Sequence, residues 1–412
     1  MKFLIIGLNY LPESTSIGPY TADLAEYLHQ RGHLVQVVTG FPTAPQWKVW
    51  TSYEGKRFMR EMINGVPVLR AYLYVPKKPG RALNRILFDM SFTISSLFGG
   101  LTIGRCDLVV CISPPLQLGL TGWFLGVLSR AHLFLHIQDI LPDAAIAAGM
   151  LNENGLLARV ASTLERFIYQ LTRGIGVISD GFVHNLITKG VPPEKIVVLP
   201  NYVDLEFMRP LERNNSFREQ HGIKPEDFLV MYSGSVALKQ GLQTLIEAAA
   251  EFGVRDDVVF YLVGEGPYLK DLKGKANELR LNNFRFLPLQ PREILPVQLS
   301  AADALVITQK RAITDVVFPG KLLYYMAAGR PMLAAVSPDS ETGRFVTSHQ
   351  VGLVVPPEEP KALAQAIRFL QQNRHEADRL GQNGRRVAEE RFDRRVVLKQ
   401  FAEHLETLAK KG

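Results

Sequence analysis

Short runs of Val, Ile and Leu recur along this chain, and segments with helical periodicity separate them. Continuous apolar runs of this kind are typical of parallel strands that are buried on both faces, because helical crossovers cover both sides of the sheet. The pattern therefore predicts an α/β fold with doubly wound parallel sheets. The expected strands are Phe3–Leu8, Leu34–Thr39, Val66–Ala71, Leu108–Ile112, Leu133–Ile137, Gly176–Ile178, Ile196–Leu199, Phe228–Tyr232, Val258–Val263, Phe284–Leu287, Ala304–Ile307, Met332–Val336 and Val351–Val355.

The length of the chain favours two domains. A chain of 412 residues is too long for one ordinary hydrophobic core and suits two domains of about 200 residues each. A polar and charged stretch at 205–226 interrupts the strand pattern, and we place the linker there. We expect an N-terminal domain at 1–204, a second domain at 205–385 and a final helical segment at 386–412.

Charge and cysteine usage restrict the partners and the compartment. The net charge of +7 permits nucleic acid, an anionic membrane surface or an anionic nucleotide as partner. The basic residues are not interleaved with aromatic residues, so we expect no nucleic-acid partner. Cys106 and Cys111 have no His or Cys companions, which favours core packing in a reducing cytoplasm. The N-terminus predicts a buried strand rather than a signal peptide.

The stretch after the strand Ala304–Ile307 has the pattern of a phosphate site. A loop ends at Pro319-Gly320, Lys321 begins a helix of about nine residues, and Gly329 ends it. Backbone N–H groups at a helix start, beside a lysine, suit a phosphate group. The alternative is an ordinary helix start in an α/β domain.

Two other loops follow strands and contain glycine. The first runs from Asn9 to Tyr20, where Gly18 would let a ligand approach the backbone closely. The second is Ser233–Gly241, another unit of strand, glycine-containing loop and helix. Lys239 in this loop either reaches a phosphate or is a solvated surface charge. A long surface loop is the alternative for the first.

Polar residues follow the strand Leu133–Ile137. His136, Gln138 and Asp139 stand where the strand ends, and ligands bind parallel sheets at the carboxyl ends of strands. These three residues are therefore candidates for a site. In the alternative, Asp139 caps the next helix.

Residues 76–105 combine a basic cluster with an apolar stretch. The cluster is Lys77, Lys78, Arg81 and Arg85, and the largely apolar residues 86–103 follow it. The stretch is about 18 residues long, at the lower limit for a membrane span, and contains Asp89. A spanning helix, a core helix and an interfacial helix with a basic flank remain alternatives.

One segment resembles a known family. Phe318-Pro-Gly-Lys-x-x-x-Tyr-Met-Ala-Ala-Gly-Arg-Pro is similar to the donor-site helix of family 4 glycosyltransferases, which have the GT-B fold, and most similar to the bacterial exopolysaccharide branch of colanic-acid type. The broad family usually carries two glutamates here. Their positions hold Val316 and Tyr324, so the roles of those glutamates are not transferred.

The resemblance implies an architecture and site residues. It implies two Rossmann-like domains that face a cleft, with the segment 386–412 packed back on the N-terminal, acceptor-side domain. His136, Gln138 and Asp139 would line the acceptor side and carry catalysis. The residues implied for the nucleotide-sugar donor are Gly18, Gly234, Ser235, Lys239, Gln240, Glu265, Pro319, Gly320, Lys321 and Tyr324.

The resemblance also implies a reaction. The enzyme would be a retaining hexosyltransferase that moves a sugar from a nucleotide-diphosphate sugar, GDP-fucose or a UDP-sugar, to a lipid-linked saccharide in cell-surface polysaccharide biosynthesis. It would work in the cytoplasm, peripherally at the inner face of the cell membrane. The chain has no Asp-x-Asp and no cluster with metal-ligand spacing, so we expect metal-independent transfer and no cofactor. The alternatives are a UDP-sugar 2-epimerase and a non-catalytic nucleotide-sugar-binding protein.

Overall fold

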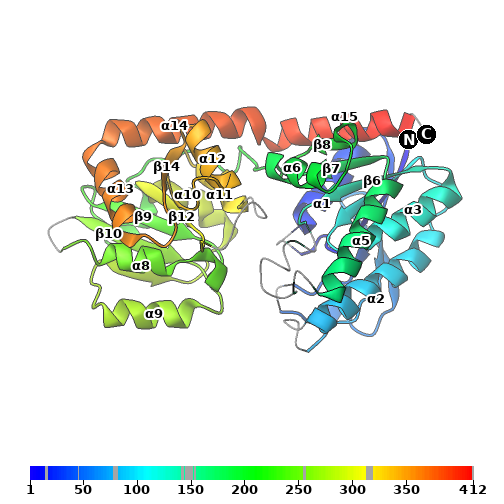
Figure 1. The fold of residues 1–412 in the computed structure, drawn as a ribbon, viewed down its shortest axis with the longest axis horizontal. Helices are drawn as coiled ribbons and strands as arrows, with labels where there is room; N and C mark the ends of the chain where they lie inside the picture. Colours follow the sequence, from blue (N-terminus) through cyan, green and yellow to red (C-terminus); the bar gives the residue numbers. More distant parts are fainter. Residues whose placement is uncertain are drawn as a thin grey trace. The chain divides into compact units, whose positions relative to one another are not determined.

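The computed structural model describes residues 1–13, 17–44, 46–77, 82–140, 143, 152, 155–253, 257–311 and 319–410 (Figure 1). The chain forms two compact units. The first comprises Met1–Asn201 together with Val397–Gly412, and the second comprises Tyr202–Val396. Residues 386–396, which the sequence grouped with the final segment, thus belong to the second unit.

The first unit contains an eight-stranded sheet in the order β3-β4-β2-β1-β5-β6-β7-β8. Its strand pairs are parallel except β3 with β4, which is antiparallel. The strand order reverses between β1 and β5, so this is where the sheet is expected to bind ligands. The strands are β1 (Lys2–Gly7), β2 (Leu34–Gly40), β3 (Phe58–Ile63), β4 (Val66–Ala71), β5 (Leu108–Ser113), β6 (His132–Ile137), β7 (Gly174–Val177) and β8 (Ile196–Val198).

Helices connect these strands and bury their apolar faces on the sheet. The long helix α2 covers β2 and β4 and contacts α3, which lies on β5 and β6 and in turn contacts α5. The helices of this unit are α1 (Gly18–Gln30), η1 (Thr51–Tyr53), α2 (Ala82–Leu101), α3 (Leu118–Ser129), α5 (Leu156–Leu171), α6 (Asp180–Thr188), η2 (Pro193–Lys195) and, from Val397 onward, α15 (Arg394–Lys410).

The second unit contains a six-stranded parallel sheet in the order β11-β10-β9-β12-β13-β14. Here the strand order reverses between β9 and β12, and the loops that leave these two strands therefore form the expected ligand site. The strands are β9 (Phe228–Ser233), β10 (Val258–Val263), β11 (Phe284–Leu287), β12 (Ala304–Thr308), β13 (Met332–Ala335) and β14 (Gly352–Val355).

The helices of the second unit cover both faces of its sheet, because buried apolar clusters lie on each side. Among them, α11 and α14 pack against each other. The helices are α7 (Ser216–Gln220), η3 (Leu238–Gln240), α8 (Gln243–Ala249), α9 (Leu269–Glu278), η4 (Arg292–Ile294), α10 (Leu295–Ala301), α11 (Gly320–Ala327), α12 (Glu341–Ser348), α13 (Pro360–Gln372) and α14 (Arg374–Arg391).

The C-terminal helix α15 packs its apolar side chains on the first unit. The ring of Phe401 lies 5.9 Å from that of Phe134 on β6, centroid to centroid, in an edge-on arrangement. Glu406 accepts hydrogen bonds from Arg31 at 2.7 Å and pairs with the His33 ring at 2.8 Å. These contacts explain why Val397–Gly412 belongs to the first unit.

Candidate functional site

The N-terminus of helix α11 lies where the strand order of the second sheet reverses. It follows β12 in the chain, and β12 lies beside β9 at the point where the strand order reverses. Pro319 is the N-cap residue, and no side chain of the described residues caps the helix. Residues 312–318, which include Phe318 of the recognised segment, lie outside the described residues. Gly320 and Lys321 thus begin a helix whose first turn lacks a side-chain acceptor.

The amine of Lys321 lies in a confined position against the loop that follows β9. Its Nζ atom is 3.7 Å from the centroid of the Tyr232 ring. A Cβ atom on Gly234 would stand 3.2 Å from the same Nζ, so a side chain at Gly234 would displace the amine. Gly234 also has a φ of +142°, a conformation that side chains disfavour. The backbone conformation therefore favours glycine at this position, and the absence of a side chain leaves room for the lysine amine.

Burial strongly affects the charge of this lysine. It lowers the pKa of the Lys321 amine from 10.5 to about 7, and no carboxylate of the described residues offsets this effect. A buried cation without an anionic partner costs free energy, and a bound anion would remove that cost. The aromatic face of Tyr232 stabilises the cation in part. The environment of Lys321 therefore favours an anionic ligand.

A hydrogen-bond network fixes the loop after β9 to α11. Tyr325 on α11 accepts from the backbone N–H of Ser233 at 2.9 Å and its hydroxyl donates to the Ser233 carbonyl at 3.2 Å. The hydroxyl of Tyr232 donates to the Ser235 carbonyl at 2.6 Å. Both tyrosines are fully buried. Because of these bonds, Gly234 and Lys321 keep a fixed separation.

The loop after β10 packs its backbone directly on the same loop. A Cβ atom on Gly264 would lie 1.9 Å from the Gly234 carbonyl oxygen, which no side chain could tolerate. The Val236 N–H donates to the Glu265 carbonyl at 2.8 Å. Glu265 and Ser235 are exposed. The structure thus brings the predicted residues Gly234, Ser235 and Glu265 together at one edge of the sheet.

Lys239 and Gln240 lie at the end of the same loop. The Lys239 carbonyl accepts from the Lys310 N–H at 3.1 Å, and the Gln240 carbonyl accepts from the Thr308 hydroxyl, so this part of the loop is fixed to the end of β12. The side chain of Lys239 is exposed. The side-chain oxygen of Gln240 is buried and has no hydrogen-bond partner among the described residues.

Tyr324 is half-buried and packs against the core of the second unit. It occupies the position of the second family glutamate, so an aromatic ring replaces a carboxylate at that point of α11. Its role in donor binding remains a prediction. Val316 lies outside the described residues.

In the first unit, Gly18 begins α1 with Pro19 behind it. A Cβ atom on Gly18 would stand 3.1 Å from the Glu13 carbonyl and 3.3 Å from the Tyr10 nitrogen, so the backbone approaches closely here. Sequence reasoning missed Glu13, whose buried carboxylate accepts from the N–H groups of Thr43 at 2.6 Å and of Ala44 at 2.8 Å. Glu13 thereby joins the loops that follow β1 and β2.

His136 is buried inside the first unit. Its ring is buried on the α15 face of the sheet, 4.8 Å from the Phe401 ring. One ring nitrogen bonds the Leu199 carbonyl at 3.1 Å and the other pairs with the Gln138 amide at 3.4 Å. Burial lowers the His136 pKa to about 4, so the ring is neutral. Both ring nitrogens have partners within the unit, and the catalytic role of His136 stays a prediction.

Gln138 and Asp139 differ from each other in exposure. Gln138 is buried and accepts a hydrogen bond from the Asn201 amide at 2.8 Å, so it fixes the segment that leaves the first unit. Asp139 is exposed at the carboxyl end of β6. Of the three predicted acceptor-side residues, only Asp139 presents its side chain at the surface. Its catalytic role stays a prediction.

Within the described part of the chain, no group of three His, Cys, Asp or Glu side chains could hold a metal ion. No described helix has the length and apolar character needed to cross a membrane. The expected absence of a metal and of a cofactor is not tested by these findings.

Comparison with known families extends over both units. Residues 15–202 match the family described as Glycosyl transferase 4-like domain, and residues 213–387 match Glycosyl transferases group 1. The putative colanic acid biosynthesis glycosyl transferase WcaI of Escherichia coli K12 is 33% identical over 410 residues, which is 97% of this chain and 98% of the relative.

Two further similarities concern the fold and a shorter segment. The structure of HepE from Anabaena in complex with UDP superposes with a TM-score of 0.73 at 19% identity, covering 99% of this chain and all of that one. An Escherichia coli enzyme named UDP-Gal:alpha-D-GlcNAc-diphosphoundecaprenol alpha-1,3-galactosyltransferase is 33% identical over 122 residues, 28% of this chain and 31% of its own. The chain therefore belongs to the family 4 glycosyltransferases with the GT-B fold and is related to the colanic-acid-type enzymes of polysaccharide biosynthesis.

Proposed function

We propose that the protein is a retaining glycosyltransferase that moves one sugar from a nucleotide-diphosphate donor to a lipid-linked saccharide. The carrying observation is the buried amine of Lys321 beside the uncapped start of α11. The diphosphate of the donor is the anion that this site requires. The donor is GDP-fucose or a UDP-sugar, and a nucleotide donor agrees with the UDP complex of HepE, which shares the fold.

The chemistry follows from where charge develops. As the bond between sugar and diphosphate breaks, negative charge accumulates on the departing diphosphate. The Lys321 ammonium group and the first backbone N–H groups of α11 can stabilise that charge without a metal ion. Binding of the anion raises the pKa of Lys321 again, so the lysine is protonated in the complex. Asp139 is proposed to orient the acceptor hydroxyl or to accept its proton late in the step.

The acceptor side of the proposal rests on an exposed apolar face in the first unit. On α2 the exposed apolar side chains recur every three or four residues and thus form one stripe. Neighbouring side chains on α3 and α5 continue it. The residues of this three-helix face are Leu83, Ile86, Leu87, Met90, Ile94, Phe98 and Leu101 on α2, Trp123, Phe124, Val127 and Leu128 on α3, and Leu156, Leu157, Val160 and Phe167 on α5.

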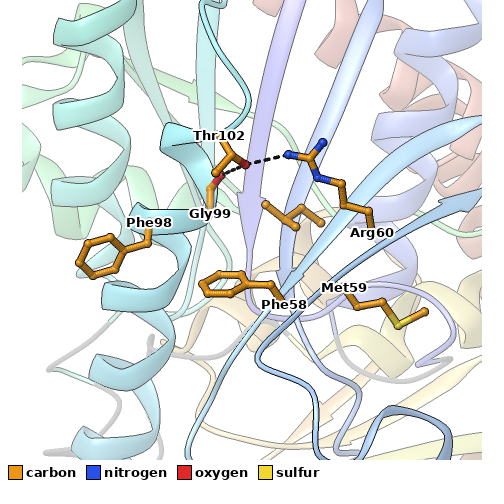
Figure 2. Close-up of a pocket in the computed structure, with 7 residues that line it drawn as sticks. Phe58, Met59, Arg60, Phe98, Gly99 and Thr102 are labelled. Carbon is orange, nitrogen blue, oxygen red and sulfur yellow. Dashed lines mark hydrogen bonds between the residues drawn. The ribbon is translucent and has the colours of Figure 1, made fainter.

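A small cavity extends the apolar surface to the edge strand β3. It has a volume of about 330 Å³ and lies between Phe58 on β3 and Phe98 on α2, and Gly99 leaves room for it (Figure 2). Its polar rim is the hydrogen bond from Arg60 to the Thr102 hydroxyl at 3.0 Å. Phe58 is 47% exposed and Phe98 is 60% exposed. Exposed apolar surface of this extent indicates an interaction site.

The charges of the three-helix face favour a lipid surface. The only acidic residues on α2, α3 and α5 are Asp89 and Glu165, and both are buried. The exposed charged residues on these helices are Arg159 and Arg166. A face with apolar and basic residues and no exposed carboxylate complements an anionic bilayer. We therefore propose peripheral binding at the cytoplasmic membrane surface, where a lipid-linked acceptor presents its sugar. Lys78 and Arg81 of the expected basic cluster lie outside the described residues.

The donor part of the proposal can be tested by thermal shift with GDP, UDP and ADP. One nucleoside diphosphate should raise the melting temperature, because a ligand at about 100 times its dissociation constant stabilises the folded protein by about 2.7 kcal/mol. The Lys321→Ala variant should lose this shift. Absence of any shift in the wild type would contradict the donor assignment.

A further inference from the structure

A groove of about 650 Å³ lies beside the carboxyl ends of β2 and β4 in the first unit. Its floor is formed by Phe41 and Leu73, which are both buried and follow β2 and β4 directly. The segment 47–57 forms one wall, and the segment 72–77 forms the other.

The groove is strongly basic. Four cations line it, Lys48, Lys56, Arg57 and Lys77, against one carboxylate, Glu54. Glu54 pairs with Lys48 at 3.1 Å. Lys56 donates only to the Ser52 carbonyl and the Met59 sulfur, and no ion pair of Arg57 or Lys77 occurs among the described residues. Three cations thus remain without a carboxylate partner, which favours a ligand with several negative charges.

The wall of the groove is held in a strained conformation. Trp47 has a φ of +53°, which a bulky side chain adopts only when its surroundings impose it, often at a functional site. Its ring lies 5.3 Å from the Phe88 ring, and the Arg85 guanidinium lies 5.2 Å above it. Phe88 and Arg85 belong to α2. The groove is therefore fixed to the first turns of the helix that carries the apolar stripe.

The opposite end of the groove is equally fixed. The Tyr53 hydroxyl donates to the Glu61 carboxylate at 3.2 Å, and Glu61 in turn accepts from the buried Arg70 at 2.6 Å. The Tyr53 ring lies 5.9 Å from Phe41 in the floor. Tyr72, which also lines the groove and is 44% exposed, offers a flat surface on which a sugar ring can stack, beside cations that bind phosphate.

We propose that this groove binds the diphosphate of a polyprenyl-diphosphate-linked saccharide, the acceptor class of the proposed function on which this inference rests. Lys56, Arg57 and Lys77 contact the diphosphate oxygens. The prenyl chain follows the apolar stripe of α2, the helix whose Arg85 and Phe88 contact Trp47 in the groove wall. The first sugar lies on the exposed ring of Tyr72. A single ligand thus accounts for a basic, an aromatic and an apolar surface that adjoin one another.

The test uses farnesyl diphosphate as a short soluble probe, titrated by calorimetry with farnesol and inorganic pyrophosphate as comparisons. Farnesyl diphosphate should bind more tightly than either, because the groove and the stripe contribute together. If pyrophosphate alone binds as tightly, the ligand is a free phosphate compound and the lipid part of the proposal is wrong. Equal binding of farnesol would exclude the diphosphate contacts.

Two variants separate this groove from the donor site. Arg57→Ala combined with Lys77→Ala should raise the dissociation constant of farnesyl diphosphate by about tenfold or more and leave nucleoside-diphosphate binding unchanged. Lys321→Ala should do the reverse. The matched control, Lys399→Ala with Lys410→Ala, removes two exposed cations from α15 of the same unit and should change neither constant.

The outcomes distinguish the inference from the proposed function. Wild-type affinity of the Arg57/Lys77 double variant for farnesyl diphosphate would overturn the groove assignment, even if nucleoside diphosphates bind normally. Failure of every nucleoside diphosphate to bind the wild type would instead contradict the proposed function. Loss of farnesyl diphosphate binding in Lys321→Ala would place that probe in the donor site and also overturn the groove assignment.

Discussion

The side chain of Lys321 lies where Gly234 leaves room for it, and burial disfavours its positive charge. Its amine lies over the Tyr232 ring and against Gly234, and burial lowers its pKa to about 7. The free protein therefore keeps this lysine only partly charged at neutral pH. Ligands that carry negative charge restore the cation, which couples donor binding to proton uptake.

Replacing Lys321 with alanine should weaken nucleoside-diphosphate binding by about 1.5–3 kcal/mol, the contribution of a hydrogen bond to a charged group. Titration calorimetry of the wild type and the variant measures the difference. Lys310→Ala, a change at a cation near the end of β12 that makes no side-chain ion pair among the described residues, serves as a control and should bind normally. Unchanged affinity of Lys321→Ala would show that the diphosphate binds elsewhere.

Donor binding should depend on pH in one direction. In the free protein the Lys321 pKa is about 7, and the bound diphosphate raises it. The complex therefore holds more protons than the free protein above pH 7, and the affinity should fall by about tenfold per pH unit from pH 7 to pH 9. Below pH 7 the lysine is protonated in both the free protein and the complex, so it contributes no pH dependence to the affinity.

Calorimetry in two buffers with different ionisation enthalpies checks this directly. The wild type should take up close to one proton per nucleoside diphosphate at pH 8. The Lys321→Gln variant should take up none. A wild type whose affinity is constant between pH 7 and pH 9 would contradict the assignment of Lys321 to the diphosphate.

Among single residues, the sequence predicted the positions that follow from a local pattern. Gly320 and Lys321 follow from a strand, a loop and a helix start in series, and Gly234 follows from the same reasoning. The burial of His136 was not predicted, because the strand pattern locates a residue along β6 but does not say that α15 covers that face of the sheet. Glu13 was missed, because its partners at Thr43 and Ala44 come from a distant loop.

Among the elements, the apolar strands were predicted to within about two residues, because burial on both faces leaves a continuous hydrophobic run. The edge strand β3 was missed. It is exposed on alternate residues, from Phe58 to Ile63, and pairs antiparallel with β4 alone, so it has no such run. The final helical segment expected at 386–412 belongs to two helices, the end of α14 and α15, because the helix is interrupted at Phe392-Asp393, where Val203 bridges to Asp393.

The packing of α15 on β6 makes the first unit sensitive to acid. His136 has a pKa of about 4 when folded and about 6.5 when unfolded, so the unfolded chain binds a proton first. Well above pH 6.5 His136 is neutral in both states and does not lower the free energy of unfolding. As the pH decreases, the unfolded chain takes up the proton and the free energy of unfolding should fall. The His136 contribution to this loss is about 2 kcal/mol between pH 8 and pH 5.

Urea unfolding of the wild type at these two pH values measures the loss. The His136→Gln variant should lose about 2 kcal/mol less over the same interval, whatever its stability at pH 7. His132→Gln, at the half-exposed start of the same strand, is the matched control and should behave like the wild type. Equal pH dependence of His136→Gln and the wild type would show that the ring is not the group that titrates.

For the whole molecule, the three-helix face predicts binding to anionic vesicles. Wild-type protein should sediment with vesicles that contain phosphatidylglycerol and less with neutral vesicles, since each basic residue near an anionic surface contributes about 1 kcal/mol. Added salt should weaken the binding, because the Debye length falls from about 10 Å at 0.1 M to about 3 Å at 1 M.

The apolar part of this prediction has its own variants. Leu87→Asp with Ile94→Asp places two charges on the exposed stripe of α2 and should abolish sedimentation. Leu289→Asp with Phe369→Asp changes two exposed apolar side chains of the second unit, 61% and 44% exposed, and should have no effect. If both pairs sediment like the wild type, the three-helix face does not meet the membrane.

The most direct measurement is sugar transfer itself. The protein is incubated with a polyprenyl-diphosphate saccharide and either GDP-fucose or UDP-sugars, with and without EDTA, and the product is analysed by mass spectrometry and NMR. We expect a mass gain of one sugar with the anomeric configuration of the donor, equal turnover in EDTA because Lys321 and the start of α11 stabilise the diphosphate, and loss of turnover in Lys321→Ala. Turnover that stops in EDTA and returns with Mn²⁺ or Mg²⁺, or a product with inverted configuration, would contradict this mechanism.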